Sequence, residues 1–209
     1  MTISSLSQKL YDVFEDETLY GFCAEASKSA LVTLMPFPDL KRLYNPVEFY
    51  EMLEGLRAKH SFKISQIKVF LEGHGVEYIT PPATPGEDGE LRAKFSYKWA
   101  ACRAGLGFIG KNSVFTHFKY GQRVRISCLI VGLRPPAGSP IPTPRCGSCE
   151  ICASACPNGY ITGRLWHEKI KREELIAYKS CAEKSRHLGP GAKYSCAHCA
   201  LACPYPFEK

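Results

Sequence analysis

The sequence has no run of ~18 apolar residues, the length that a membrane-spanning helix needs, so we expect no membrane association. The opening stretch MTISSLSQKLYDVFEDETLYG is acidic and lacks the apolar segment of a secretory signal. We therefore expect a cytoplasmic protein. Apolar residues make up 45% and charged residues 22% of the 209 residues, which is ordinary for a globular chain with one good core.

Cysteine, in contrast, is abundant. Eight of the eleven cysteines lie between positions 146 and 203, and without an export signal such a cluster predicts metal binding rather than disulfide bonds. The formal net charge of +7 taken alone favours an anionic partner. Two [4Fe–4S]²⁺ clusters on eight thiolates would lower that charge of +7 to +3. A nucleic-acid partner is therefore not favoured, although a tRNA-linked substrate stays open.

The apolar pattern predicts helices and strands in mixed order. We expect helices over 1–20, 45–75 and 91–105, and strands over 29–38, 76–80, 113–118 and 123–133. KYGQ, residues 119–122, predicts a hairpin between the last two strands, and 81–90 predicts a loop. The proline-rich stretch 134–145 marks a linker, so we expect an α/β sandwich core over 1–133 and a cysteine module over 146–209.

The cysteine module contains two related runs. Cys146, Cys149, Cys152 and Cys156, followed by Pro157, have the C-x2-C-x2-C-x3-C-P spacing of bacterial ferredoxins, in which the fourth cysteine serves the other cluster. The second run has one cysteine fewer, and Cys181 can supply the missing ligand.

The eight cysteines are the number of ligands that two four-iron clusters need. The expected sets are Cys146, Cys149, Cys152 and Cys203 for the first cluster, and Cys156, Cys181, Cys196 and Cys199 for the second. Two structural zinc sites are the alternative, because C-x2-C pairs also suit tetrahedral zinc. Two separate zinc sites would not need the crossed C-x3-C-P pattern twice.

The stretch AGLGFIGKNS, residues 104–113, matches two nucleotide-binding motifs. Gly105, Gly107 and Gly110 spell G-x-G-x-x-G, and with Lys111 they spell most of a P-loop. Both motifs need a strand before the glycines and a helix after them, whereas the predicted order here is inverted. A P-loop also needs Ser or Thr where this chain has Asn112. The flanks therefore exclude both motifs, and a glycine-rich turn that lets helix and strand pack closely stays open.

Several features together resemble epoxyqueuosine reductase, whose catalytic core is related to the reductive dehalogenases. They are CRAGLGFIGKNS, the β-rich stretch that ends in LIVGL, the proline-rich linker, and two C-x3-C-P runs with an isolated cysteine between them. The upstream SALVTLMPFP and the helix after it also look like this family, so the resemblance covers roughly residues 20–206.

The resemblance implies an α+β protein with a nitroreductase-like core that binds cobalamin and a ferredoxin-like module that reduces it. Cobalamin would carry the difficult chemistry, while the protein supplies position and protons. The positions that carry over as cobalamin contacts are Gly105, Gly107, Gly110, Lys111 and Asn112. The implied electron donor is a ferredoxin or flavodoxin.

The sequence departs from this family at the proton donor. The family has an Asp in a DSAP-like segment before the loop, whereas this chain has EYITPPATP, with Thr80 near that place. The acidic residues that follow are expected in a solvated turn: Glu87, Asp88 and Glu90. Tyr78 and Tyr97 are the remaining catalytic candidates, although half-buried aromatic residues of this kind usually belong to the core. The catalytic residue is therefore unknown.

Other residues favour structural roles. His117 is expected to be a surface or hydrogen-bonded residue rather than a corrinoid ligand, and His198 is expected beside the second cluster. The three remaining cysteines fall on apolar patterns and are expected to be buried: Cys23, Cys102 and Cys128.

Two other functions stay open. The family has a longer amino-terminal region and often a helical-repeat tail, whereas this chain ends six residues after Cys203, so we expect a shortened member. Such a chain is a corrinoid-dependent reductase, a ferredoxin-like electron carrier without an organic cofactor, or a reductive activator of another protein's corrinoid.

Overall fold

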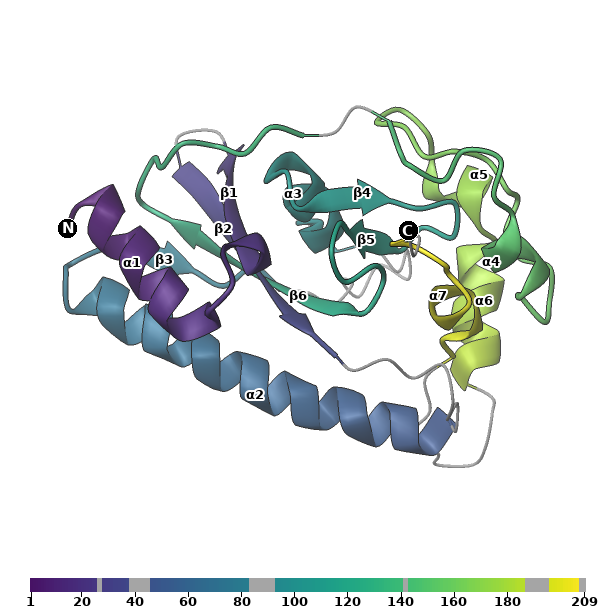
Figure 1. The fold of residues 1–209 in the computed structure, drawn as a ribbon, viewed down its shortest axis with the longest axis horizontal. Coiled ribbons are helices and arrows are strands. Elements are labelled where there is room, and N and C mark those ends of the chain that lie inside the picture. The colour runs from purple at the N-terminus through teal and green to yellow at the C-terminus, as the bar shows by residue number, and fades with distance from the viewer. Residues whose placement is uncertain (26–27, 38–45, 83–92, 141–142, 187–195, 207–209) are drawn as a thin grey trace. The chain divides into compact units, whose positions relative to one another are not determined.

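The computed structural model describes residues 1–25, 28–37, 46–82, 93–140, 143–186 and 196–206 (Figure 1). The chain forms two compact units. Unit 1 consists of Met1–Met35, Arg57–Leu106 and Arg125–Ile141, and unit 2 of Pro36–Leu56, Gly107–Val124 and Pro142–Lys209. Residues 146–209 thus belong to the same unit as 107–124. The expected domains, 1–133 and 146–209 with a linker between them, stay a prediction.

Unit 1 is built around a four-stranded sheet with the strand order β1-β2-β6-β3. The strands are β1 (Tyr20–Glu25), β2 (Lys28–Pro36), β3 (Tyr78–Ile79) and β6 (Val124–Val131). β1 and β2 are antiparallel, and so are β3 and β6. β2 is buried from Ser29 to Leu34, which explains why its sequence is almost continuously apolar rather than alternating.

Two predicted helices are confirmed next to this sheet. α1 (Ile3–Phe14) is capped by the Thr2 side chain and buries an apolar stripe of Leu6, Leu10, Val13 and Phe14. A 3₁₀ turn, η1 (Glu17–Leu19), leads into β1. α2 (Pro46–Glu72) begins in unit 2 and continues in unit 1, where Figure 1 shows it beside α1 and Lys63 donates a hydrogen bond to the Val13 carbonyl.

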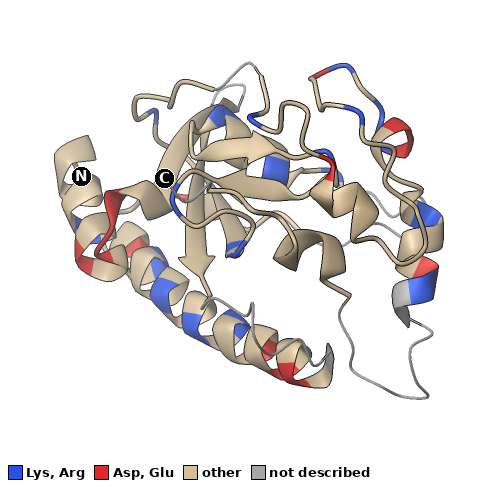
Figure 2. Cartoon of the chain, turned by 45° about the vertical axis from the view of Figure 1, so that its right-hand side comes forward, with Lys and Arg blue, Asp and Glu red and all other residues tan. Residues whose placement is uncertain are grey.

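The charges of α2 are ordered along its axis. Acidic residues occupy its first turns and basic residues follow in its middle, as the red and blue segments of Figure 2 show, while its last residue is Glu72. This order complements the helix dipole at its amino-terminal end, where negative charge is stabilising. None of the described helices is long and apolar enough to cross a membrane.

The sequence prediction was wrong at α3. This helix spans Tyr97–Arg103 and not the full stretch 91–105, because Ser96 is the amino-terminal cap and accepts a hydrogen bond from the Trp99 N–H. Phe95 therefore precedes the helix. Leu91 and the acidic residues Glu87, Asp88 and Glu90 lie outside the described residues.

The predicted hairpin between 113–118 and 123–133 is also wrong. β5 (Phe115–His117) pairs with β4 (Gly107–Ile109) in a two-stranded sheet, whereas β6 belongs to the four-stranded sheet. A tight turn is present at 119–122, but its return strand is a single bridge between His117 and Gly121. The strands on either side of the turn, β5 and β6, therefore belong to different sheets.

The rest of unit 2 consists of short helices joined by irregular segments, as the loop-rich sequence predicts. They are α4 (Ile151–Ser154), α5 (Arg172–Leu175), α6 (Tyr178–Arg186) and α7 (His198–Leu201). Ile161, Leu175 and Ile176 are buried there, and a bridge joins Ile161 to Ile176. These three residues form a small apolar cluster in this part of unit 2.

One buried histidine makes unit 1 sensitive to acid. His60 is 0% exposed, and because Arg125 can only donate, the His60 Nδ1 accepts from Arg125 at 3.3 Å and the Nε2–H donates to Thr33 at 3.0 Å. Burial, followed by the charges of Arg125 and Lys63, lowers the pKa of His60 from 6.5 to about 3. The folded protein therefore keeps this imidazole neutral at pH values where the unfolded chain binds a proton.

We expect the free energy of unfolding to fall by ~1.4 kcal/mol per pH unit below pH 6.5, which amounts to about 2 kcal/mol at pH 5. The variant His60→Gln cannot bind this proton, so its loss of unfolding free energy between pH 8 and pH 5 should be smaller by about that amount. Urea unfolding of both proteins at the two pH values measures the difference. An identical pH dependence in the two proteins would contradict the assignment.

Candidate metal centre

The two cysteine runs fold alike. In the first, α4 follows Cys149 and contains Cys152; in the second, α7 follows Cys196 and contains Cys199. Both helices are one turn long, and their cap residues, Glu150 and Ala197, have nearly the same backbone angles, φ −125°, ψ 15° and φ −134°, ψ 10°. Cys156 and Cys203 occupy corresponding places after these turns. The repeat seen in the sequence is therefore also a repeat in the backbone.

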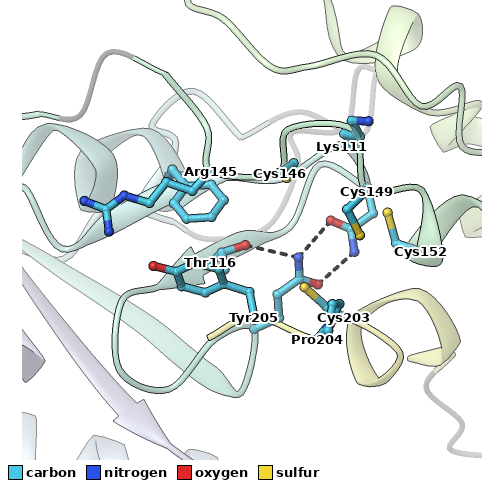
Figure 3. A pocket seen from close by; sticks show the side chains of 12 residues that line it. Lys111, Thr116, Arg145, Cys146, Cys149, Cys152, Cys203, Pro204 and Tyr205 are labelled. Carbon is cyan, nitrogen blue, oxygen red and sulfur yellow. Dashed lines mark hydrogen bonds between the residues drawn. The ribbon is translucent and has the colours of Figure 1, made fainter. Parts of the chain in front are cut away.

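Four cysteines from both runs line one pocket within unit 2 (Figure 3). They are Cys146, Cys149, Cys152 and Cys203. Cys203 belongs to the second run, so the pocket joins the three closely spaced cysteines of one run to the last cysteine of the other. This is the crossing expected for a two-cluster ferredoxin module.

The remaining cysteines are less fully connected. Burial raises the pKa of the Cys199 thiol, and the nearby thiols of Cys196, Cys152 and Cys181 raise it further. Cys156 is half-buried, and its sulfur accepts a hydrogen bond from the Tyr160 N–H at 3.4 Å. The structure therefore brings three of the four residues expected for the second cluster near one another, and its contacts do not place Cys156 with them.

The cysteines have the character of ligands. All eight are half-buried, and none of the eleven cysteines, which the structure describes throughout, forms a disulfide. Among the described residues, no three His, Cys, Asp or Glu side chains are close enough to hold a single metal ion.

Burial keeps the metal-free thiols protonated. Burial raises the pKa of Cys203 to about 11; the Tyr205 N–H lowers it, and Cys146, Cys152 and Cys149 raise it again. Burial likewise raises the pKa of Cys152, with Cys146 and Cys149 acting in the same direction. Because the thiolate is the ligand, cluster binding must release these protons.

The glycine loop connects helix, strand and pocket. Gly105, with φ +75°, ends α3 in a Schellman motif: its N–H bonds to the Cys102 carbonyl, and the Leu106 N–H bonds to the Ala101 carbonyl. A Cβ on Gly107 would lie 2.1 Å from the Thr116 carbonyl oxygen of β5. The helix-to-strand turn is therefore as predicted, and these glycines allow the chain to approach itself.

A corrinoid finds no open cradle at these glycines. A Cβ on Gly105 would lie 3.0 Å from the Ser139 carbonyl oxygen, and one on Gly110 would lie 3.1 Å from both Asn112 and Gln122. Lys111 and Asn112 are buried, with exposed fractions of 4% and 2%, and both line the cysteine pocket. The described loop thus fits the metal centre, and its expected contact with cobalamin stays a prediction.

The other candidates lie elsewhere. Tyr78 donates to Glu72, and Tyr97 donates to the Pro81 carbonyl at 2.5 Å; neither lines the cysteine pocket. The hydrogen bond to Glu72 raises the pKa of Tyr78, and burial raises that of Tyr97. His117 is buried, and its Nδ1 accepts the N–H groups of residues 119 and 120, as its hydrogen-bonded role predicted.

The three cysteines outside the runs are buried as expected. Cys23, Cys102 and Cys128 have exposed fractions of 1%, 3% and 1%. Burial raises the pKa of Cys102 to about 12 and raises that of Cys128 as well. These thiols are therefore neutral packing residues.

Sequence reasoning missed part of the pocket. Its further lining residues are Phe108, Thr116, Gln122, Arg145, Pro204 and Tyr205. Arg145 lies at the end away from the cysteines, with its guanidinium 5.0 Å from the Phe118 ring centroid. Tyr205 packs edge-on against Phe108, with 5.2 Å between ring centroids. Only Arg145 and Pro204 adjoin a ligand cysteine in the sequence, so the others carried no signal there.

Residues 145–206 match the family described as a 4Fe-4S double cluster binding domain. The match contains all eight cysteines of the two predicted ligand sets. The epoxyqueuosine reductase of Listeria monocytogenes serovar 1/2a is 33% identical to this chain over 105 residues. The resemblance predicted from the sequence is confirmed. The aligned part is 49% of this chain and 27% of the Listeria epoxyqueuosine reductase, so the chain spans much less than that relative's length.

Solved structures share the fold. A crystal structure of epoxyqueuosine reductase with an epoxyqueuosine-modified tRNA-Tyr stem loop is 22% identical, with a TM-score of 0.57 over 85% of this chain and 48% of that chain. The catabolic reductive dehalogenase NpRdhA is 16% identical, with a TM-score of 0.66 over 90% of this chain and 30% of that chain. At these identities the likeness shows a shared mixed fold of helices and sheet.

Proposed function

We propose that this chain is an iron–sulfur reductase that passes single electrons through two [4Fe–4S] clusters to bound cobalamin. The observation that supports the clusters is the pocket in which Cys203 joins Cys146, Cys149 and Cys152. When bound, clusters of this kind accept and donate one electron at a time. The proposed second set is Cys156, Cys181, Cys196 and Cys199.

The chain's own residues hold and shield such a centre. The cysteines are half-buried, and Phe108, Pro204 and Tyr205 cover the pocket with apolar surface. Exclusion of water strengthens every charge interaction with the thiolates. Arg145 and Lys111 place positive charge along the same pocket, which favours the net negative charge of a cube with four thiolates.

The cobalamin part of the proposal rests on the resemblance to epoxyqueuosine reductase, and a nitroreductase-like arrangement of the core is part of the same proposal. We derive no chemical step through cobalamin, because the described glycine loop packs against its own chain. That packing favours the second candidate, a ferredoxin-like carrier or an activator of another protein's corrinoid. The tRNA stem loop in the solved relative makes a tRNA-linked substrate a further proposal.

Reconstitution and titration separate these functions. Protein reconstituted anaerobically should contain about eight irons and eight sulfides per chain. Two zinc ions without sulfide would overturn both candidates. Cobalamin added to the reconstituted protein should then change its absorption spectrum at micromolar concentration if the chain is the reductase. No binding at that concentration leaves the carrier or activator, and reduction by ferredoxin or flavodoxin tests the proposed donor in either case.

A further inference from the structure

Two adjacent loop residues reach different cysteine runs. Lys111 is 4% exposed and lines the same pocket as Cys146. The side-chain amide of Asn112 donates to the carbonyl oxygen of Cys199 at 3.2 Å. Cys146 belongs to the first proposed ligand set and Cys199 to the second. The loop therefore places one residue beside a ligand of each proposed cluster.

The orientation of Asn112 is fixed by its neighbours. Its Nδ2 donates to Gln122 Oε1 at 2.8 Å, and Gln122 Nε2 donates back to Asn112 Oδ1 at 3.0 Å. The Val114 N–H also donates to Asn112 Oδ1 at 3.3 Å, which identifies this atom as the oxygen. Gln122 is held in turn by a hydrogen bond to Thr116 Oγ1 at 3.1 Å. The N–H that faces Cys199 is therefore preorganised.

Gly110 makes room for this amide pair. A Cβ at Gly110 would lie 3.1 Å from Asn112 Oδ1 and 3.1 Å from Gln122 Nε2. Contacts this short would force one of the two amides to shift by a few tenths of an ångström. The third glycine of the loop thus serves the orientation of Asn112.

We propose that Lys111 and Asn112 set the reduction potentials of the two clusters separately, Lys111 for the cluster on Cys146 and Asn112 for the cluster on Cys199. The inference rests on the proposed clusters. One electron from a low-potential donor reduces each cluster from the 2+ to the 1+ state, and no bond or proton changes place. Positive charge and N–H donors near the sulfurs favour the more negative reduced state and raise its potential.

The test is a redox titration of the anaerobically reconstituted protein with dithionite, followed by paramagnetic resonance. In Lys111→Met the ratio of reduced to oxidised first cluster should fall about tenfold at a fixed potential, which equals 59 mV for one electron. The same ratio for the second cluster should change less than about twofold. Lys111→Arg should keep the ratio of the first cluster close to that of the unsubstituted protein, because arginine keeps the positive charge. Lys119→Met removes an exposed lysine of the same segment and should change neither.

The second cluster has its own variants. Asn112→Ala, Gln122→Leu and Gly110→Ala should each lower the reduced fraction of the second cluster by more than that of the first cluster, whose pocket Asn112 and Gln122 also line. The signals are assigned with single-cluster variants, Cys203→Ser and Cys196→Ser. If a variant loses iron, Lys111→Gln or Asn112→Ser replaces it.

Normal iron content with unchanged potentials in all of these variants would overturn the inference, as would equal shifts of both clusters. Absence of iron and sulfide from the unsubstituted protein would instead overturn the proposed function. The two failures are therefore distinguishable.

Discussion

Replacement of Cys203 by serine is expected to remove the first cluster and leave the second. The content should fall from about eight irons and sulfides to about four, because one cube needs four thiolates. Cys203 is 51 residues from its nearest partner in sequence, Cys152, yet both line the same pocket. Cys156→Ser should remove the second cluster, although Cys156 is four residues from Cys152. Iron and sulfide analysis with paramagnetic spectra measures both losses.

The matched control is Cys102→Ala. Cys102 is 3% exposed and lies outside both runs, so this variant should keep both clusters. If Cys203→Ser and Cys156→Ser removed the same cluster, the crossed ligand assignment would be wrong. If neither variant changed the iron content, the cysteines would not be the ligands.

The crossing could be predicted from the sequence because C-x2-C-x2-C-x3-C-P is the spacing of two-cluster ferredoxins, in which the last cysteine serves the other cluster. The same gaps in both runs also produce the same one-turn helix, α4 with Cys152 and α7 with Cys199. The helix α1 and the strand β2 were predictable for a similar reason, since each buries an apolar face of its own. These features need little knowledge of the rest of the chain.

The partner of each strand could not be predicted in this way. β5 pairs with β4, and β6 enters another sheet, although the turn between them has the composition of a hairpin. β1 was missed because Gly21 and Ala24 weaken its apolar pattern. In the structure, a Cβ at Gly21 would lie 3.1 Å from the Ala104 carbonyl oxygen, so this glycine is required by a contact distant in the sequence.

The role of the glycine loop was also beyond the sequence. Gln122 orients Asn112 across ten positions, and Asn112 reaches Cys199 across 87 positions. A glycine motif indicates that another group packs closely against the backbone at the glycine, but it does not identify that group. For this loop the approaching groups are protein atoms: the Thr116 carbonyl at Gly107 and the amide pair at Gly110.

A contact of the same kind predicts a large effect at Gly121. Gly121 and Gly159 have nearly equal left-handed angles, φ +60° and +61°. A Cβ at Gly121 would lie 2.0 Å from the Tyr205 carbonyl oxygen, whereas at Gly159 it would meet no described atom within 4 Å. Alanine at either position incurs the strain of the left-handed backbone, about 1 kcal/mol. Overlap with Tyr205 adds roughly 1–3 kcal/mol at Gly121 alone.

Gly121→Ala should therefore lower the free energy of unfolding by about 3 kcal/mol, and Gly159→Ala by about 1 kcal/mol. Anaerobic urea unfolding of the reconstituted proteins measures both values. Because the Tyr205 N–H bonds to the Cys203 sulfur, displacement of Tyr205 should also make the first cluster lose iron faster to a chelator. Equal losses in the two variants would show that backbone strain alone acts at Gly121. A larger loss at Gly121, confined to the first cluster, would show that this turn holds the last ligand of the pocket in place.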